Sequence, residues 1–261
     1  MESIPGSQKQ QKRRAEILEK LEDEKYVSVN ALSSYFGVSE VTIRKDLDVL
    51  EEINLVKRSH GGVGKSTKKK ASVDYNSKRK LHSVEKARIA AAAIDLIHDG
   101  DSVIINVGST SAFVCEEIKK RKKVIVITNA MHVFLEFMDC KNVTVFFLGG
   151  RYDNDFQITV GEDVEDQLSK YTADALIMGM DGIDVDSGAT SYNHLEDSIM
   201  SKMILQAKHR ILVADHSKFG RVAFAHIADL NAFDTLITDD YADNREYYEK
   251  IRAMGVKVIT V

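Results

Sequence analysis

A helix with two distinct faces is the feature of this chain that most restricts its fold. In the stretch 39–62, the apolar residues Ile43, Leu47 and Leu50 are spaced at i, i+4 and i+7. This spacing predicts that they share one buried face of a helix. Polar and basic side chains fall outside that stripe in the first two turns and point to solvent: Thr42, Arg44 and Lys45.

The residues before this helix predict two further helices and a tight turn. Ser39 suits the N-cap of the two-faced helix, since its hydroxyl can accept from an unpaired backbone N–H. Gly37 can adopt the tight turn that would separate it from a short amphipathic helix carrying Val29, Leu32, Tyr35 and Phe36. A third helix is predicted at about residues 10–24, with an apolar stripe of Ile17, Leu18 and Leu21.

A basic hairpin is predicted after the two-faced helix. Asn54 suits a left-handed cap, residues 55–59 a short strand, and Gly61-Gly62 a turn. The hairpin carries three basic side chains, Lys57, Arg58 and His60. Three helices and a basic hairpin predict a winged helix-turn-helix whose polar helix face enters the DNA major groove. The alternative is that these charges only form a solvated helix face.

The distribution of charge favours DNA binding, although the whole chain of 261 residues has a net charge of -4. Residues 1–90 carry 19 Lys and Arg against 13 Asp and Glu, whereas the remainder carries 17 against 27. A basic N-terminal part joined to an acidic part fits a DNA-binding module attached to a body that does not bind DNA. The basic excess is modest, so we expect a dimer or tetramer to multiply the phosphate contacts.

The segment resembles the winged helix-turn-helix of the DeoR-type bacterial transcriptional regulators. The resemblance rests on Thr42-Ile43-Arg44-Lys45-Asp46-Leu47, Leu50-Glu51 and Arg58-Ser59-His60-Gly61-Gly62. It implies DNA contacts from Ser39, Thr42, Arg44, Lys45, Lys57, Arg58 and His60. Lys45 stands where that family usually has arginine, and it lacks the bidentate fork, so we assign Arg44 to base reading and Lys45 to a phosphate.

Cysteine usage and the N-terminal composition suggest a cytoplasmic protein. Cys115 and Cys140 are expected to be reduced, and no Cys/His spacing fits zinc. No signal peptide or membrane-spanning run is expected, and no cofactor is indicated. The first eight or so residues, with Pro5, are expected to form a disordered arm.

The remaining chain predicts an α/β domain with a mostly parallel sheet. Apolar runs separated by helical patterns are typical of a parallel sheet covered on both faces. The expected strands are 103–107, 124–128, 143–148, 175–179, 211–214, 235–238 and 256–261, and the expected helices between them are 111–120, 129–138, 162–170, 195–208 and 243–254. We therefore expect a winged helix-turn-helix domain at 9–64 (helix-turn-helix about 27–46), a linker at 65–83 and an α/β domain at 84–261. Lys68 to Lys70 in that linker could touch the DNA backbone, or the linker could be only a solvated hinge.

Polar residues follow most of the predicted strands. Ligands in such folds bind at the carboxyl ends of the strands, so these residues define a candidate anion pocket. The Gly108-Ser109-Thr110 turn opens a helix whose backbone N–H groups suit a phosphate, and Lys218 could neutralise an anion. The candidate effector-binding residues are Gly108, Ser109, Thr110, Asn129, Gly149, Asp181, Glu196 and Lys218.

This region resembles the sensor domain of the DeoR-type family, which is similar in fold to ribose-5-phosphate isomerase. The resemblance implies a phosphorylated sugar or a near relative as effector. Asn106 stands where that family often has aspartate, so the hydroxyl-binding pattern can differ. Residues 188–196 leave two possibilities open: they line the sugar end of the pocket with His194 and Glu196, or they form a surface loop and helix start.

Three functions remain as hypotheses at this point. The favoured one is a transcriptional repressor of a carbohydrate-metabolism operon that releases double-stranded operator DNA when a phosphorylated sugar binds. The alternative is a sugar-phosphate isomerase or deaminase with an appended DNA-binding domain, which would need a base beside the reacting carbons. The third is an architectural DNA-binding protein, which predicts no effect of phosphorylated metabolites on DNA affinity.

Overall fold

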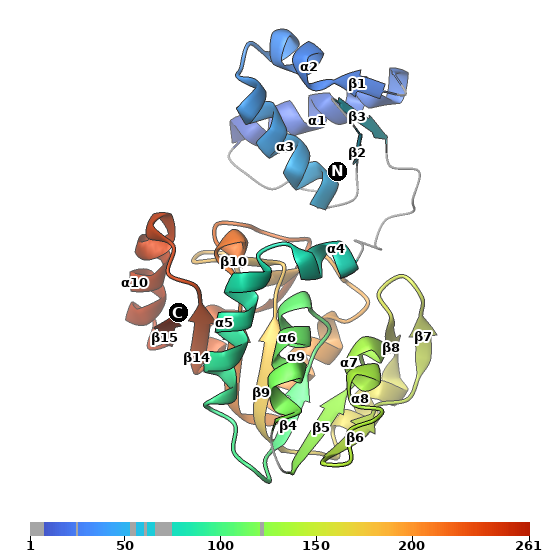
Figure 1. The fold of residues 1–261 in the computed structure, drawn as a ribbon, viewed down its shortest axis with the longest axis vertical. Coiled ribbons are helices and arrows are strands. Elements are labelled where there is room, and N and C mark those ends of the chain that lie inside the picture. Colours follow the sequence, from blue (N-terminus) through green and yellow to red (C-terminus); the bar gives the residue numbers. More distant parts are fainter. Residues whose placement is uncertain (1–7, 25, 53–55, 60–61, 66–74, 121–122) are drawn as a thin grey trace. The chain divides into compact units, whose positions relative to one another are not determined.

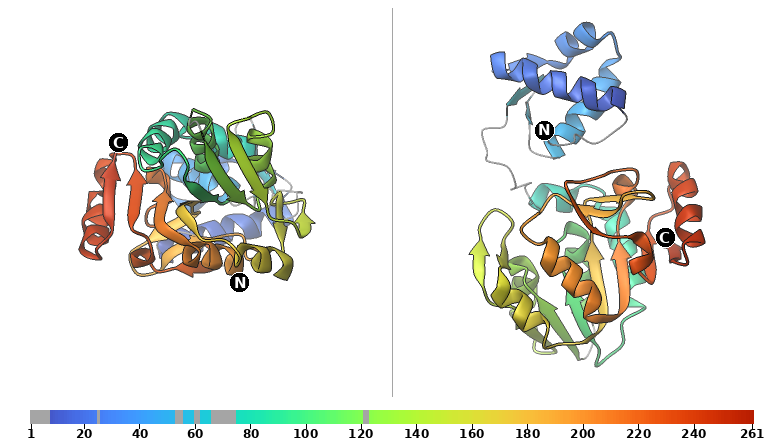
Figure 2. Two further views of the ribbon diagram at one scale, coloured as in Figure 1. Left: turned by 90° about the horizontal axis from the view of Figure 1, so that it is seen from below. Right: turned by 180° about the vertical axis from the view of Figure 1, so that it is seen from behind.

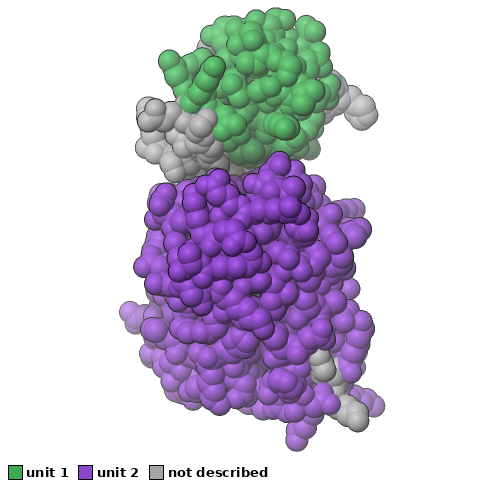
Figure 3. Space-filling view, turned by 90° about the vertical axis from the view of Figure 1, so that its left-hand side faces the viewer, with its two compact units in different colours: residues 1–74 green, residues 75–261 purple. Residues whose placement is uncertain are grey.

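The chain folds into two compact units, each with its own buried apolar cluster. In the computed structural model, residues 8–24, 26–52, 56–59, 62–65, 75–120 and 123–261 are described. The units are Met1–Asp74 and Tyr75–Val261, coloured separately in Figure 3. Because their apolar clusters share no residue, each unit has a core of its own.

The N-terminal unit is a winged helix-turn-helix. Its elements are α1 (Gln8–Asp23), β1 (Tyr26–Ser28), α2 (Val29–Phe36), α3 (Glu40–Glu52), β2 (Val56–Ser59) and β3 (Gly62–Lys65). The three strands form an antiparallel sheet in the order β1-β3-β2. The hairpin of β2 and β3 packs beside α3, in the place that a wing requires.

Local sequence signals determine where the helices of this unit begin and end. The Ser28 hydroxyl caps α2 by accepting from the Ala31 N–H (3.1 Å), and Gly37 ends α2 in the left-handed conformation (φ 61°). Ser39 caps α3, as the sequence predicts, by accepting from the Thr42 N–H at 3.2 Å. The predicted anchors Ile43, Leu47 and Leu50 are all fully buried.

The C-terminal unit is built on a parallel sheet whose strand order is β15-β14-β12-β9-β4-β5-β6. Its strands are β4 (Ser102–Ile105), β5 (Val124–Thr128), β6 (Val143–Phe147), β9 (Ala173–Gly179), β12 (Ala207–Val213), β14 (Thr235–Thr238) and β15 (Lys257–Thr260). All neighbouring pairs in this sheet are parallel. The order reverses between β4 and β9, so their carboxyl ends flank a topological switch point, where open α/β sheets bind ligands.

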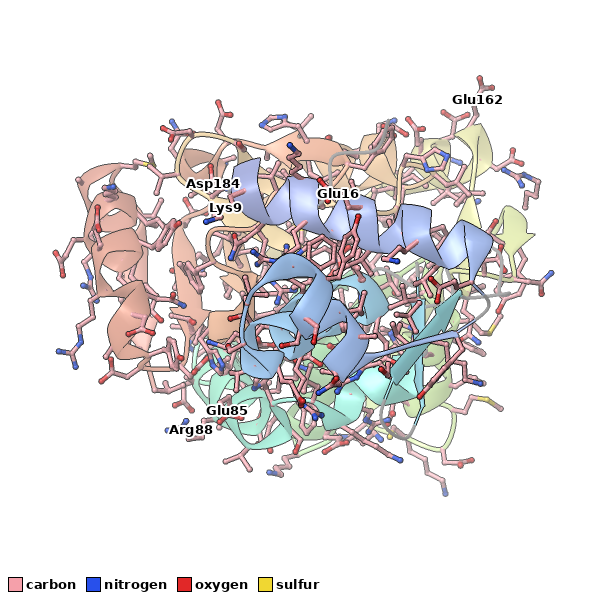
Figure 4. The ribbon with its side chains drawn as sticks, turned by 90° about the horizontal axis from the view of Figure 1, so that it is seen from above. Lys9, Glu16, Glu85, Arg88, Glu162 and Asp184 are labelled. Atoms are coloured by element: carbon pink, nitrogen blue, oxygen red, sulfur yellow. The ribbon has the colours of Figure 1, made fainter. Side chains whose placement is uncertain are left out.

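Helices cover both faces of this sheet. The helices are α4 (Tyr75–Lys80), α5 (Ser83–Ile94), α6 (Ser109–Ile118), α7 (Met131–Glu136), α8 (Glu162–Leu168), α9 (Asp197–Leu205) and α10 (Arg245–Ala253). Figure 1 shows α5, α6 and α7 on one face, and the view from behind in Figure 2 shows α8 and α9 on the other. Buried Ile89 and Ala93 line the inner side of α5, while Glu85 and Arg88 lie on its outer side (Figure 4).

Two small antiparallel sheets were not expected from the sequence. One consists of β10 (Gly182–Asp184), β11 (Gly188–Ser191) and β13 (Ala225–Ala228), and the other of β7 (Arg151–Asp153) and β8 (Ile158–Val160). Residues 188–191 are therefore the middle strand of a small sheet, and they are buried. These strands are three or four residues long, too short for alternation to be recognised in the sequence.

The predicted element types are confirmed in the parallel sheet, whereas some predicted boundaries are wrong. The predicted helix 195–208 ends at Leu205, and β12 already starts at Ala207, because its first residues pair with β9. The expected linker 65–83 is also too long, since Tyr75–Lys80 form α4 and belong to the C-terminal unit. The expected N-terminal arm, Asn54, His60, Gly61 and Lys68 to Lys70 lie outside the described residues.

Candidate functional site

The exposed face of α3 carries the residues predicted to contact DNA. Arg44 and Lys45 are exposed, and Thr42 is partly exposed with its hydroxyl 2.9 Å from the Ser39 hydroxyl. Arg44 forms a surface ion pair with Glu40 across one helical turn (3.2 Å). Such a pair contributes at most about 1 kcal/mol, so Arg44 can exchange Glu40 for a DNA group at small cost.

The wing is attached to α3 through Arg58. The Arg58 guanidinium pairs with Asp48 of α3, and the Arg58 backbone N–H donates to the Glu51 carboxylate at 2.9 Å. Lys57, the neighbouring basic residue of β2, is exposed. The structure thus places Lys57 on the surface of the wing, while Arg58 also holds the wing in position.

A buried carboxylate that the sequence reading overlooked supports α3 from behind. Asp46 is almost fully buried, and it accepts from Arg13 Nε (2.5 Å) and Arg14 Nε (2.8 Å) of α1. The sequence contained a signal for this burial, because Asp46 follows Ile43 by three residues and therefore lies on the same buried face of the helix. These two ion pairs fix α3 relative to α1.

In the C-terminal unit, charged side chains meet at the carboxyl ends of the central strands. Asp181, after β9, pairs with Lys78 of α4 (2.9 Å), and Asp215, after β12, lies 3.7 Å from the Lys86 ammonium of α5. Lys218 is close enough for its charge to lower the pKa of both carboxyls. These five residues form the strand-end charge cluster: Lys78, Lys86, Lys218, Asp181 and Asp215.

Burial and charge act against each other in this cluster. Burial lowers the pKa of Lys86 to about 8, although the neighbouring Asp215 acts in the opposite direction. Burial raises the pKa of Asp181, but the charges of Lys78 and Lys218 outweigh it and hold that pKa at about 2. The low pKa of Asp181 keeps its carboxylate ionised near neutral pH, and three lysines meet two carboxyl groups in this cluster, so an anionic ligand could exchange with the carboxylates as a partner of the lysines.

In a second part of the site, neutral side-chain amides surround the carboxyl group of Glu196, which is fully buried. Its carboxylate accepts from the side-chain amides of Asn129 (3.0 Å) and Asn193 (3.1 Å). Burial raises the pKa of Glu196 to about 7 against these hydrogen bonds, and the charge of Asp181 raises it further. We call Asn129, Asn193 and Glu196 the amide–carboxyl cluster.

Three buried oxygen atoms at the strand ends have no hydrogen-bond partner within the described part of the chain. They are Asn129 Oδ1, Asp215 Oδ2 and Thr238 Oγ1. Buried polar atoms are normally hydrogen-bonded, so each exception calls for an explanation. A ligand rich in hydroxyl groups could supply the missing donors.

The candidate effector residues do not all meet at one place. Gly108 and Ser109 start α6 beside the switch point, where the first backbone N–H groups of a helix have no partner within that helix. Gly149 is different, because both its N–H (3.1 Å) and its carbonyl (2.8 Å) pair with the Gln167 side chain. We therefore remove Gly149 from the candidate ligand contacts.

The structure places two other parts of the site that the sequence left open, Asn106 and the segment 188–196. Asn106 uses its side chain on the Gly179 backbone, donating to the carbonyl (3.0 Å) and accepting from the N–H (2.9 Å), so it joins β4 to β9. In the segment 188–196, Glu196 is buried in the site, whereas His194 is exposed and packs against Phe224. Thus Glu196 but not His194 lies in the interior at the strand ends.

Lys78, Lys86 and Asn193 were not among the residues proposed from the sequence. A signal existed for Lys86, which shares the buried stripe of α5 with Ile89, Ala90 and Ala93. No comparable signal existed for Lys78 or Asn193, whose partners are distant in the sequence or depend on a turn. The cysteines Cys115 and Cys140 are both free, as expected.

No metal site and no membrane span are apparent among the described residues. Within those ranges, no three His, Cys, Asp or Glu side chains are grouped so that they could hold a metal ion. The same ranges contain no helix that combines the length and the apolar character needed to cross a membrane.

Comparison with known proteins identifies both units. Residues 13–69 match the DeoR-like helix-turn-helix domain, and residues 81–240 match the DeoR C terminal sensor domain. The chain is 33% identical to the putative aga operon transcriptional repressor of Escherichia coli O157:H7, covering 95% of this chain and 93% of that protein. It is 32% identical to the HTH-type transcriptional repressor GlcR of Bacillus subtilis (strain 168), covering 96% of each.

Two further similarities are more distant. The glycerol-3-phosphate regulon repressor of Escherichia coli (strain K12) is 30% identical, with 88% of this chain and 91% of that protein covered. Among solved structures, a ribose 5-phosphate isomerase from Methanocaldococcus jannaschii matches 53% of this chain and 55% of its own, with 16% identity and a TM-score of 0.40. That score is too low to support an inference, so the assignment rests on the two domain matches and the full-length relatives: the chain belongs to the DeoR family of transcriptional regulators.

Proposed function

We propose that this protein represses a carbohydrate-metabolism operon and releases its operator when a phosphorylated sugar binds at the strand-end site. The chain is a regulator of its family and not an enzyme, in keeping with its full-length relatives, which are transcriptional repressors. One of those relatives is named for a glycerol-3-phosphate regulon, which supports a phosphorylated ligand. We place the activity in the cytoplasm, where operator DNA and sugar phosphates occur together in a bacterium.

For the DNA-binding unit, we propose that Arg44 reads a base edge with help from Thr42. Both residues lie in the first turns of α3, the part of a recognition helix that reaches bases in this kind of module. Lys45, Lys57 and Arg58 then hold phosphates, and we assign the same role to His60 from the sequence resemblance. Ser39 has its hydroxyl at the start of α3, where the helix N-terminus can also receive a phosphate.

The observation that carries the ligand proposal is the strand-end charge cluster at the β4–β9 switch point. Its three lysines suit a phosphoryl group beside Lys218 and the start of α6, with Gly108, Ser109 and Thr110 supplying backbone or hydroxyl donors. The unpartnered Oδ1 of Asn129 suits a hydroxyl group of the sugar. Asp181 and Glu196 provide further acceptors on the same side.

Regulation requires that the ligand favour one of two arrangements of the protein. A ligand that bound the DNA-competent and the DNA-free arrangements equally would shift nothing, however tightly it bound. We propose a homodimer or homotetramer as the working form, because the modest positive charge of one copy gives few phosphate contacts. Release of DNA then follows from a change in how the copies present their two α3 helices.

The test is operator release by a panel of sugar monophosphates and glycerol 3-phosphate, measured by fluorescence anisotropy at fixed salt concentration. At least one compound should weaken operator binding, and Lys218→Ala should bind the operator normally but respond only at higher compound concentration. Lys257→Ala, which removes an exposed lysine of β15, serves as the matched control. If every phosphorylated compound leaves DNA affinity unchanged, the proposal is wrong and an architectural role gains support.

A further inference from the structure

We propose that Lys78 is a ligand-binding residue and that α4 is the segment that the bound ligand immobilises. An anionic ligand at the strand-end charge cluster would bind Lys78 together with Lys218, and would thereby hold α4 against the sheet edge. This inference depends on the proposed function for the presence of the ligand. It adds the residue and the segment through which occupancy of the site would be transmitted.

The position of α4 depends directly on the charge cluster. Lys78 of α4 pairs with Asp181 at 2.9 Å. The Lys86 ammonium donates to the backbone carbonyls of Lys78 (2.6 Å) and Leu81 (2.5 Å), and it lies 3.7 Å from Asp215. Both carboxylates of the cluster are therefore connected to α4, one through Lys78 and the other through Lys86.

The remaining contacts of α4 combine ion pairs with contacts to aromatic rings. Arg79 pairs with Glu116 of α6 and with Glu136 of α7 (3.2 Å). The Tyr75 ring lies 4.3 Å from the His132 ring, while Leu81, just after α4, is about half exposed. A short helix of six residues that ion pairs help to hold is sensitive to a charge that enters the site beside it.

The junction between α4 and α5 is a strained residue that also touches the strand ends. His82 adopts the left-handed backbone conformation (φ 53°), which residues other than glycine rarely adopt. Its ring lies 4.4 Å from the His216 ring, and His216 in turn bonds to Asp239 at 2.6 Å. Strain of this kind persists only where surrounding contacts enforce it. We therefore expect the backbone at His82 to be the hinge about which α4 moves when those contacts change.

The connection to the DNA-binding unit follows from the sequence. Only residues 66–74 separate the end of β3 from the start of α4. A change in the freedom of α4 therefore changes the point from which the chain leaves the sensor unit. Figure 1 shows α4 at the end of that unit toward which β9 and β14 point.

The direction of the effect follows from thermodynamic linkage. A phosphoryl dianion adds negative charge beside the lysine that α4 carries, so it binds the docked arrangement of α4 more tightly than the undocked one. Binding must then increase the docked population. The ligand is expected to slow local opening of α4, by a factor that grows as one plus the ratio of ligand concentration to Kd.

Hydrogen exchange of the full chain tests this, with inorganic phosphate as the probe and chloride at the same ionic strength as the reference. In the wild type, exchange in peptides covering residues 75–82 should slow about threefold when phosphate is at about twice its Kd. Lys78→Gln should lose this slowing, and Lys78→Arg, which keeps the charge, should recover it. Lys80→Gln is the matched control, because it removes a lysine of the same helix outside the cluster, and it should behave as the wild type.

Peptides covering residues 108–112 and 215–219 separate this inference from the proposed function. If phosphate protects those peptides but leaves α4 unchanged in the wild type, the anion site stands and the role of α4 is overturned. If phosphate protects none of these peptides, the anion site and the role of α4 both fail. Asp181→Asn covers the case in which Lys78→Gln does not fold. It removes the carboxylate partner of Lys78 and should speed α4 exchange without phosphate, and α4 exchange equal to that of the wild type would contradict the proposal.

Discussion

The two units of this protein differ in the burial of one ion pair at each proposed ligand surface: Arg44–Glu40 on α3 and Lys86–Asp215 at the strand ends. In the DNA-binding unit, Arg44 and its partner Glu40 are each about half exposed, so both remain solvated when the pair separates. In the sensor unit, the side chains of Lys86 and Asp215 are 3% and 1% exposed. A solvated pair can exchange partners at little cost, whereas a buried charge that loses its partner is strongly unfavourable.

This difference suits the two tasks that we propose. A DNA-reading surface must give up its internal partners on contact with DNA, and weak surface pairs allow that. A sensor must change its structure in response to a small ligand, and buried charges make its conformation depend on which partners are present. Substitutions of the buried strand-end charges should therefore affect stability, and substitutions of the exposed charges of α3 should affect DNA affinity.

The largest expected effect is on the sensor unit and follows from Lys86→Met. The substitution leaves Asp215 without its buried partner and removes the donor to the Lys78 and Leu81 carbonyls. We expect a loss of roughly 3–5 kcal/mol in the free energy of unfolding, measured by urea denaturation at neutral pH. Lys120→Met removes an exposed lysine and should cost far less; equal losses would show that burial is not the cause.

A smaller effect is expected from the titration of Glu196. Its pKa is about 7 in the folded unit against 4.5 in the unfolded chain, so the folded state binds the extra proton. Stability from this group is therefore complete below pH 4.5 and is lost as the pH rises through 7, by roughly 3–4 kcal/mol. Buried His132, whose pKa is lowered to about 4, contributes a slope of opposite sign.

The contribution of Glu196 is isolated by subtracting Glu196→Gln from the wild type. Thermal melts between pH 5 and 8 should show that the wild type loses stability relative to the variant as the pH rises. A constant difference across this range would mean that Glu196 does not titrate there. His132 is common to both proteins, so its slope cancels.

The next effect concerns DNA affinity. Arg44→Ala should weaken binding to the specific operator by on the order of 1–3 kcal/mol and relax the preference at one base position. Its free energy of unfolding should change little, because the side chain is exposed and pairs only with Glu40 on the surface. Lys45→Ala should instead weaken binding to all DNA sequences equally and reduce the salt dependence of binding. Unchanged operator binding by Arg44→Ala would assign recognition to another element.

The smallest effect is expected from Glu40→Gln. It removes the surface partner of Arg44 and a carboxylate in the first turn of α3. Helix and ion-pair effects together should cost no more than about 0.5–1 kcal/mol in the free energy of unfolding, while DNA affinity should rise because one negative charge leaves the phosphate-facing surface. Lower DNA affinity at unchanged stability would contradict the separation between the two units.

The fold was largely predictable from local signals. The anchors Ile43, Leu47 and Leu50 and the Ser39 cap define α3 within a few residues, so helical periodicity was sufficient there. The strands 124–128 and 235–238 were predicted at their observed bounds because both are continuous apolar runs. The small antiparallel sheets were not predictable, because strands of three or four residues leave no readable alternation.

The candidate site was predictable only in part. Placing Asp181 and Lys218 at strand ends required only the alternation of strands and helices, whereas Glu196 lies in the segment 188–196, whose role the sequence left open. For Gly149, nothing local in the sequence indicates that Gln167 pairs with both of its backbone groups, which leaves it less available to a ligand. Lys78 was assigned to a linker because its polar surroundings resemble one, although its partner Asp181 lies 103 residues further along the chain.

The sequence by itself determined the class of this protein: a winged helix-turn-helix, a parallel α/β domain and a DeoR-family identity. Those features are encoded over short stretches, as periodicity, capping residues and motifs. Only the tertiary structure decided which charges share a site, since Lys78 meets Asp181 and Asn129 meets Glu196 across long separations. The physical reason is that burial and pairing, which set the charge state of each group, exist only once the chain is folded.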